Sequence, residues 1–312
     1  MNKRIRKVLA AGAAAAVFMT GGFTCFAEET EAAEAVTEAL EEVSEDTASD
    51  EQAILVVSFG TSYDDSRDIT IGAIEEAISS AFPDYQVRRA FTSQIIIDKL
   101  AEEEGLEIDN VTEALDRAVE DGITTLVVQP THLMDGLEYS DVVNEVAAYA
   151  DSFEKVVMGE PLLTSDEDYD AVIAAITEAT SEYDDGETAI CFMGHGTEAE
   201  SNQVYAALQD KLAEQGYENY YVGTVEAEPT LEDVLAAVGQ GDYTKAVLAP
   251  LMVVAGDHAN NDMAGDEEGS WKTEFEGAGY EVQCLIQGLG QLEAIQDIYV
   301  AHTQAAVDSL AQ

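Results

Sequence analysis

The chain has 312 residues, enough for one large or two ordinary domains with a sizeable core. Its 13 Lys and Arg residues against 64 Asp and Glu residues give a formal net charge of −51. This charge repels nucleic acid and anionic membrane surfaces, so neither is expected as a partner. It also attracts cations everywhere, which makes a group of carboxylates alone a poor indicator of a metal site.

Residues 1–27 have the pattern of a secretory signal peptide. The basic segment MNKRIRK precedes the apolar segment VLAAGAAAAVFMT, and CFA ends the stretch with a small residue at Ala27. The apolar segment is shorter than the roughly 20 residues of a membrane-spanning helix. We therefore expect cleavage near Ala27, an exported mature protein and no stable membrane span after cleavage. An uncleaved N-terminal anchor is the alternative.

Residues 28–52 form an acidic segment that contains no Lys or Arg. Repulsion between like charges at this density favours an extended, solvated chain. We interpret the segment as a linker between the export signal and the folded body.

From Ala53 onward, apolar runs alternate with amphipathic stretches of helical period, such as DITIGAIEEAISSAF and NQVYAALQDKLAEQG. Continuous apolar strands that alternate with helices predict an α/β fold whose parallel sheets are covered by helices. The predicted strands are AILVVSF, YQVRRAF, TTLVVQP, KVVMGEPL, TAICFMG, NYYVGTV, KAVLAPLMVV and VQCLIQGL.

The eight predicted strands fall into two similar sets of four. AILVVSFGTS corresponds to AICFMGHGTE, and TTLVVQPTHLMDG corresponds to KAVLAPLMVVAGD, in the same order along the chain. We therefore predict two similar α/β halves, residues 53–184 and 185–312, each with a four-stranded parallel sheet. A cleft between such halves is the expected binding site.

Three metal-ligating side chains follow consecutive strands of the second half. His195 follows the fifth strand, Glu226 ends the sixth, and His258 follows the seventh. Because ligands bind beyond the carboxyl ends of parallel strands, we expect these side chains to meet at one edge. Two imidazoles and a carboxylate suit a borderline divalent ion and leave coordination positions open. Glu228 is a rival for the carboxylate position, and either histidine could instead be structural.

Several residues of the first half are candidates for contact with a substrate. His132 ends the third strand and would face the same cleft, with Glu138 shortly after it. Ser58 and Thr61, in the turn SFGTSYDDSRD, could offer hydroxyl donors to an anionic group at a helix start. The turn lacks the Lys and the glycine spacing of a phosphate loop, so no nucleotide is expected.

For several other polar and sulfur-containing residues, a simple structural role is an alternative to a functional one. Arg89 could bind acidic substrate groups or simply offset neighbouring acids, as could Arg88. His302 is predicted to lie on the surface of the last helix. Cys191 and Cys284 lie in apolar runs, and the sequence does not decide whether they pair.

The body of the chain resembles the anaerobic sirohydrochlorin cobaltochelatases, which are class II tetrapyrrole chelatases. The resemblance extends from about Ala53 to His302. It implies a two-domain chelatase fold with a tetrapyrrole in the cleft. The motifs that carry the resemblance are LVVSFGTSY, RAFTS, GEPLL, FMGHGTE, VGTVE and PLMVVAGDHANNDMAGDEEGSWKTEF.

The resemblance also assigns roles to individual residues. His195, Glu226 and His258 fall on the family's metal-binding positions, which favours Glu226 over Glu228. His195 falls on the proton acceptor.

We therefore expect ATP-independent insertion of Co²⁺ into sirohydrochlorin in anaerobic cobalamin biosynthesis, with Fe²⁺ or Ni²⁺ as alternative metals. An extracytoplasmic metal- or haem/tetrapyrrole-binding protein that retains the fold is the alternative function, because corrin precursors are made in the cytoplasm. The sequence permits a homo-oligomer without requiring one.

Overall fold

The computed structural model describes residues 51–311, which lie within one compact unit, Ala48–Gln312. The predicted signal peptide and nearly all of the predicted acidic linker lie outside the described residues. The linker was expected to extend to Gln52, but this residue already pairs with Thr125 as the first residue of a strand. In the described part of the chain, no helix combines the length and the apolar character that crossing a membrane requires.

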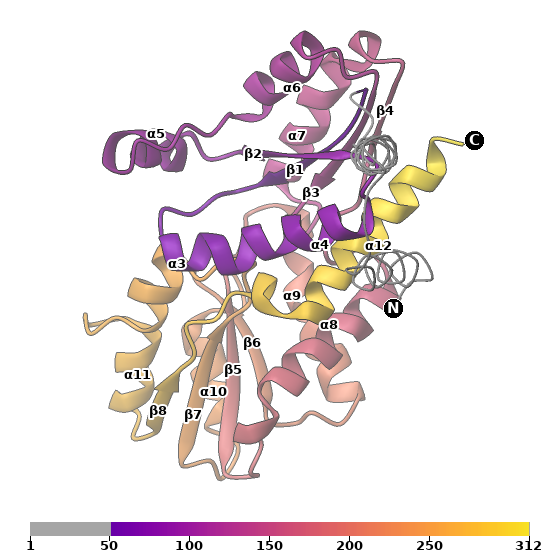
Figure 1. The fold of residues 1–312 in the computed structure, drawn as a ribbon. Coiled ribbons are helices and arrows are strands. Elements are labelled where there is room, and N and C mark those ends of the chain that lie inside the picture. The colour runs from indigo at the N-terminus through magenta and orange to yellow at the C-terminus, as the bar shows by residue number, and fades with distance from the viewer. Residues whose placement is uncertain (1–50, 312) are drawn as a thin grey trace, which may run out of the picture. The chain divides into compact units, whose positions relative to one another are not determined.

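Two four-stranded parallel sheets form the framework of the body, as the sequence predicted (Figure 1). The strand order is β2-β1-β3-β4 in the first sheet and β6-β5-β7-β8 in the second, so the two sheets share one topology. The strands are β1 (Gln52–Ser58), β2 (Gln86–Phe91), β3 (Thr125–Pro130), β4 (Lys155–Met158), β5 (Thr188–Gly194), β6 (Tyr220–Thr224), β7 (Lys245–Pro250) and β8 (Glu281–Cys284).

Helices connect the strands and cover the sheets (Figure 1). In the first half they are α3 (Asp64–Arg67), η1 (Asp68–Gly72), α4 (Ala73–Ala81), α5 (Gln94–Glu103), α6 (Val111–Glu120), α7 (Leu137–Ala148), η2 (Ala150–Ser152) and α8 (Asp166–Ala179). After α8 come η3 (Ser181–Tyr183), η4 (Glu200–Asn202), α9 (Gln203–Glu214), α10 (Leu231–Val238), η5 (Ala259–Met263), α11 (Trp271–Gly277), η6 (Leu289–Gln291) and α12 (Glu293–Ser309).

Local sequence explains where these elements begin and which of them are buried. Helices α6, α8 and α10 each start with a capping box, for example Asn110 with Glu113, which satisfies backbone donors at the helix start. The central strands β1 and β5 are buried along almost their whole length, which accounts for their unbroken apolar sequences.

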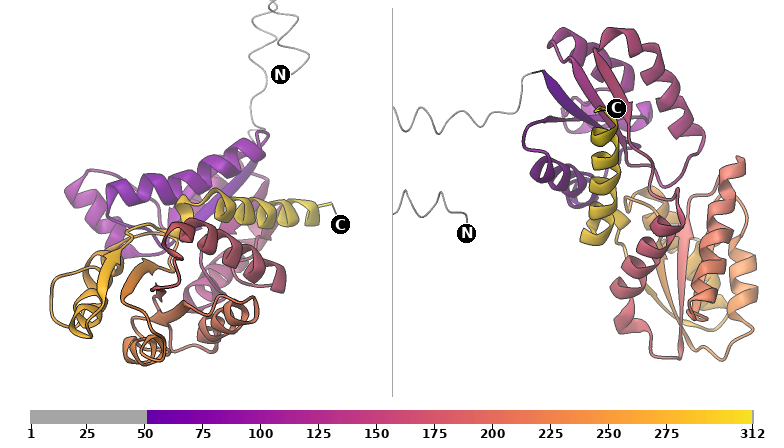
Figure 2. Two further views of the ribbon diagram at one scale, coloured as in Figure 1. Left: turned by 90° about the horizontal axis from the view of Figure 1, so that it is seen from below. Right: turned by 90° about the vertical axis from the view of Figure 1, so that its right-hand side faces the viewer.

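The last helix, α12, packs against the first half, although it follows the second half in sequence. It contacts α4, β3 and β4, and both views of Figure 2 show it beside elements of the first half; it also contacts α8, which lies beside α9 (Figure 1). The buried hydroxyl of Tyr299 donates to the backbone oxygen of Thr131 at 2.9 Å, and Thr303 donates to Gln129 at 3.1 Å. A division at residues 184/185 thus separates the two sheets, but α12 ties the halves together.

Cys191 and Cys284 are both free thiols. They lie on β5 and β8 and are separated by β7, where Leu248 pairs with both. The structure therefore answers the open question of their pairing: the intervening strand keeps the two sulfur atoms apart.

Candidate metal centre

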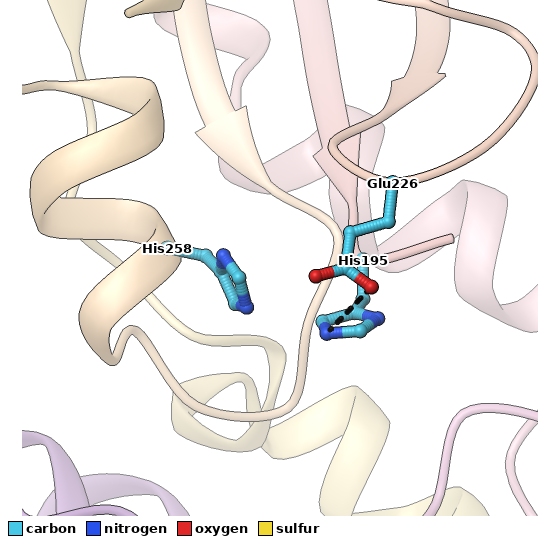
Figure 3. Close-up of side chains that lie close together, drawn as sticks. All are labelled: His195, Glu226 and His258. Carbon is cyan, nitrogen blue, oxygen red and sulfur yellow. Dashed lines mark ion pairs between the residues drawn. The ribbon is translucent and has the colours of Figure 1, made fainter. Parts of the chain in front are cut away.

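His195, Glu226 and His258 converge at the carboxyl edge of the second sheet (Figure 3). Each offers one ligand atom, and these atoms all lie within 4.8 Å of one another. The residues follow β5, β6 and β7, and β5 lies between the other two strands. The parallel sheet thus brings together side chains that are far apart in sequence, as expected.

The loop after β6 continues the pairing of the sheet beyond the last regular strand residue. Val225 N–H donates to Gly194 O at 3.0 Å, and Glu226 N–H donates to His195 O at 2.9 Å. These bonds hold Glu226 beside His195, with 3.9 Å between Oε2 and Nε2. Glu228 is outside the group of three ligands, so the geometry agrees with the preference for Glu226.

Two glycines hold His195 in place. Its Nδ1 lies 2.8 Å from the backbone oxygen of Gly196, so this nitrogen carries the proton and Nε2 remains free. Gly196 has φ +88°, and a Cβ there would lie 2.8 Å from the backbone nitrogen of Ala227. A Cβ at Gly194 would lie 2.2 Å from the ring of Tyr205. Only glycine fits at either position.

His258 lies immediately before η5 and is oriented by an acid one turn later. Its Nδ1 is 2.7 Å from Oδ2 of Asp262, and its ring centroid is 4.7 Å from that of His195. A carboxylate in this position fixes the tautomer and increases the basicity of the other ring nitrogen. The sequence analysis missed Asp262, although a His and an Asp four residues apart at a helix start could have indicated it.

The three side chains are accessible from solvent. Their exposed fractions are 48% for His195, 57% for Glu226 and 32% for His258. Two imidazole nitrogens and one carboxylate oxygen suit borderline divalent ions, and three protein ligands leave coordination positions open. The arrangement can hold such an ion and present it to another molecule.

Glu138 lies in the first turn of α7. Burial raises the pKa of Glu138, while the charge of the nearby His195 lowers it. The carboxyl group therefore lies near the metal-ligating histidine although it belongs to the other half. A direct contact of Glu138 with a substrate stays a prediction.

His132 lies behind Glu138 rather than beside the metal centre. Its side chain is only 8% exposed, and Nε2 is 3.8 Å from Oε2 of Glu138. Among the described residues, neither ring nitrogen has a hydrogen-bond partner. Burial lowers the pKa of His132 to about 4, so the ring is neutral near pH 7.

Ser58 and Thr61 are buried and bonded within the protein. Ser58 Oγ accepts from Thr131 at 2.7 Å, and Thr61 Oγ1 accepts from the backbone of Tyr63 at 3.2 Å. The helix that follows starts with Asp64 and Asp65, whose carboxylates occupy the positive end of the helix. These contacts stabilise the turn, and the binding of an anionic substrate by Ser58 and Thr61 stays a prediction.

Two further expectations change with the structure. Arg89 binds Glu75 through two bonds of 2.6 and 2.7 Å, and it lines a cavity away from the metal centre. It therefore neutralises a neighbouring acid, which is the plainer of its two alternatives.

His302 is only 13% exposed and lies 3.0 Å from Asp168, so the prediction of a surface histidine is wrong. His302 is mostly buried because helix α12, which carries it, packs onto the first half.

The comparisons with known proteins agree with this geometry. The family model for cobalt chelatase (CbiK) matches residues 52–308. A sirohydrochlorin cobaltochelatase from Salmonella typhimurium is 37% identical over 257 residues, which cover 82% of this chain and 97% of the relative. The sirohydrochlorin cobaltochelatase CbiKC from Nitratidesulfovibrio vulgaris is 33% identical over 261 residues, covering 83% of this chain and 92% of the relative.

Solved structures support the fold. SirB from Bacillus subtilis with Fe³⁺ aligns with a TM-score of 0.59 at 13% identity, covering 84% of this chain and 98% of that one. The sirohydrochlorin chelatase SirB from Bacillus subtilis subspecies spizizenii in complex with cobalt aligns with a TM-score of 0.58 over the same shares. The two-half arrangement is thus a chelatase fold. With its family match over most of its length and two relatives above 30% identity, the chain belongs to the CbiK cobalt chelatase family.

Proposed function

We propose that this protein is a sirohydrochlorin cobaltochelatase, which inserts Co²⁺ into the tetrapyrrole without ATP in anaerobic cobalamin biosynthesis. The observation that carries the proposal is the convergence of His195, Glu226 and His258 at a solvent-accessible sheet edge. The alignments cover 97% and 92% of the two relatives that are named for this activity.

The geometry suggests an order of events at His195. Because Nδ1 donates to Gly196, only Nε2 is available to bind the metal or to accept a pyrrole proton. One lone pair cannot do both at once. His195 would therefore accept a proton as the ion passes to the macrocycle, and not before.

The ligand set also bears on the choice of metal. Nitrogen-rich ligation favours Co²⁺, with Fe²⁺ or Ni²⁺ as further substrates, over Mg²⁺, which prefers oxygen ligands. The described residues near the centre supply acids, hydroxyls and imidazoles, and the proposed reaction requires no nucleotide.

We further propose that the mature protein is exported after cleavage near Ala27, on the strength of the N-terminal sequence pattern. Mature protein recovered from cells should begin near Glu28. An intact Met1 on most of the protein would contradict the proposal. The sequence permits self-association, and the size of the mature protein in solution would test whether it forms a homo-oligomer.

The decisive experiment gives the purified mature protein sirohydrochlorin and Co²⁺ and follows the visible spectrum of the macrocycle. The expected result is enzyme-dependent conversion to the cobalt form, at a much lower rate with Mg²⁺. Tight binding of Co²⁺ or of the tetrapyrrole without turnover would favour the alternative of an extracytoplasmic binding protein instead.

A further inference from the structure

The three ligands of the metal centre are not held in the same way. The loops that carry His195 and Glu226 are hydrogen-bonded to each other and to other parts of the second half. Gly196 N–H donates to the hydroxyl of Tyr205 at 3.3 Å, and Asn202 donates to the backbone of Glu228 at 2.6 Å. These bonds lie within the second half, so its own packing fixes two of the three ligands.

The loop that carries His258 is bonded to the first half as well as to the second, where Gly290 N–H donates to Val253 O at 3.0 Å. The backbone N–H of Ala255 donates to Oγ of Ser66 at 3.0 Å, and both residues are buried. Gly256 lies close to Thr61, since a Cβ there would lie 3.3 Å from Oγ1 of Thr61. Asp257 is 3.5 Å from the hydroxyl of Tyr63. The three residues before His258 therefore each contact the segment between β1 and η1.

This junction is not packed on all sides. A cavity of about 620 Å³ adjoins it, and its lining includes Tyr63, Ser66, Ala255 and Asn260. A buried hydrogen bond beside such a space can be lost without a rearrangement of the core. The position of the His258 loop therefore depends on these polar contacts as well as on the packing of Val254 against the buried cluster of the first half.

We infer that the segment around α3 positions His258, and that Ser66 is a positioning residue for the metal centre. The first half thus contributes to metal affinity without supplying a ligand, and the affinity depends on how the two halves meet. The inference rests on the proposed role of His258 as a metal ligand.

The test measures Co²⁺ affinity by titration of the visible cobalt spectrum, with no tetrapyrrole present. Ser66→Ala should weaken Co²⁺ binding about fivefold, as expected for one net hydrogen bond. Tyr63→Phe, which leaves the core intact, should weaken it about twofold, because its contact is longer. Ser66→Ala should add nothing in a His258→Ala background, since both changes act through one ligand.

Thr177→Ala is the matched control. Thr177 is also a buried hydroxyl, bonded to the backbone of Ile173 within α8. Its loss should lower stability and leave Co²⁺ affinity unchanged. In insertion assays, Ser66→Ala should raise the half-saturating Co²⁺ concentration and leave the rate at saturation intact.

Three results would overturn the inference: equal Co²⁺ affinity of Ser66→Ala and wild type, an undiminished effect in the His258→Ala background, or the same loss in Thr177→Ala. If His258→Ala itself left Co²⁺ affinity unchanged, the ligand assignment in the proposed function would fail instead. The two failures are therefore distinguishable.

Discussion

His195 and His258 both direct Nδ1 toward the protein, one to a backbone oxygen and the other to a carboxylate. In each ring this leaves Nε2 for the metal, but the partners differ in charge. Asp262 carries a negative charge beside His258, whereas His195 donates to the neutral backbone of Gly196. The two histidines therefore suit different roles, holding the ion and exchanging a proton.

Removing each imidazole should separate these roles. We expect His195→Ala to abolish insertion even at saturating Co²⁺, because excess metal does not replace a missing proton acceptor. His258→Ala should keep residual activity that rises with Co²⁺ concentration. Initial rates measured over a range of Co²⁺ concentrations distinguish the two. Equal, cobalt-independent activity of wild type and His195→Ala would show that His195 is only structural.

Asp262 should contribute to metal binding through His258. Asp262→Ala should weaken Co²⁺ affinity by roughly 10- to 100-fold, the usual range for the loss of a carboxylate behind a ligating histidine. Asp266→Ala is the control, since Asp266 lies nearby but binds Lys272. Equal Co²⁺ affinity of the two variants in a spectroscopic titration would argue against the orienting role.

At the scale of elements, the metal centre depends on the ends of β5, β6 and β7. Backbone hydrogen bonds between the two chains continue for one residue past β5 and two residues past β6, and the tight turn at Gly196 then directs the chain away from the sheet. The turn requires both a left-handed backbone and the absence of a side chain. The same glycine thus fixes the backbone and the position of the adjacent His195.

Gly196→Ala should therefore damage the site as well as the fold. A positive φ alone costs a non-glycine residue about 1 kcal/mol or more. The contact with Ala227 would in addition displace the loop of Glu226. Gly186→Ala provides the control, because Gly186 has φ +79° with no atom within 4 Å of its Cβ position. Thermal unfolding should show both losses of stability, and only Gly196→Ala should lose Co²⁺ binding.

At the scale of the whole molecule, buried polar groups connect α12, the end of β3 and the start of α7. Tyr299 on α12 donates to Thr131, the residue before His132, and His132 lies against Glu138. The neutral His132 is part of this buried region. Protonation of His132 would place a charge in this buried region, so the stability of the whole fold should respond to pH.

The direction follows from the pKa of His132, about 4 in the folded protein against an ordinary 6.5. Between these values the unfolded chain binds a proton that the folded chain does not, so stability is lost as pH falls. The loss between about pH 7 and about pH 4.5 amounts to about 2 kcal/mol. For His132→Leu, the free energy of unfolding measured with urea should decrease over the same pH range by about 2 kcal/mol less than for wild type. The same pH dependence in both proteins would contradict the shifted pKa.

The sequence by itself determined the two parallel sheets and the meeting of His195, Glu226 and His258. Apolar strands alternate with helices, and a parallel sheet places the ends of consecutive strands at one edge, so local pattern and topology suffice. Resemblance to known chelatases then narrowed the choice between Glu226 and Glu228.

Only the tertiary structure decided the side-chain contacts between helices and loops outside the regular sheet. Three such contacts join separate elements: His302 with Asp168, Arg89 with Glu75, and Ser66 with Ala255. Local periodicity carries no information about such contacts, because they depend on how whole helices and loops pack. For the same reason, the attachment of α12 to the first half could not be predicted from a sequence in which it follows the second.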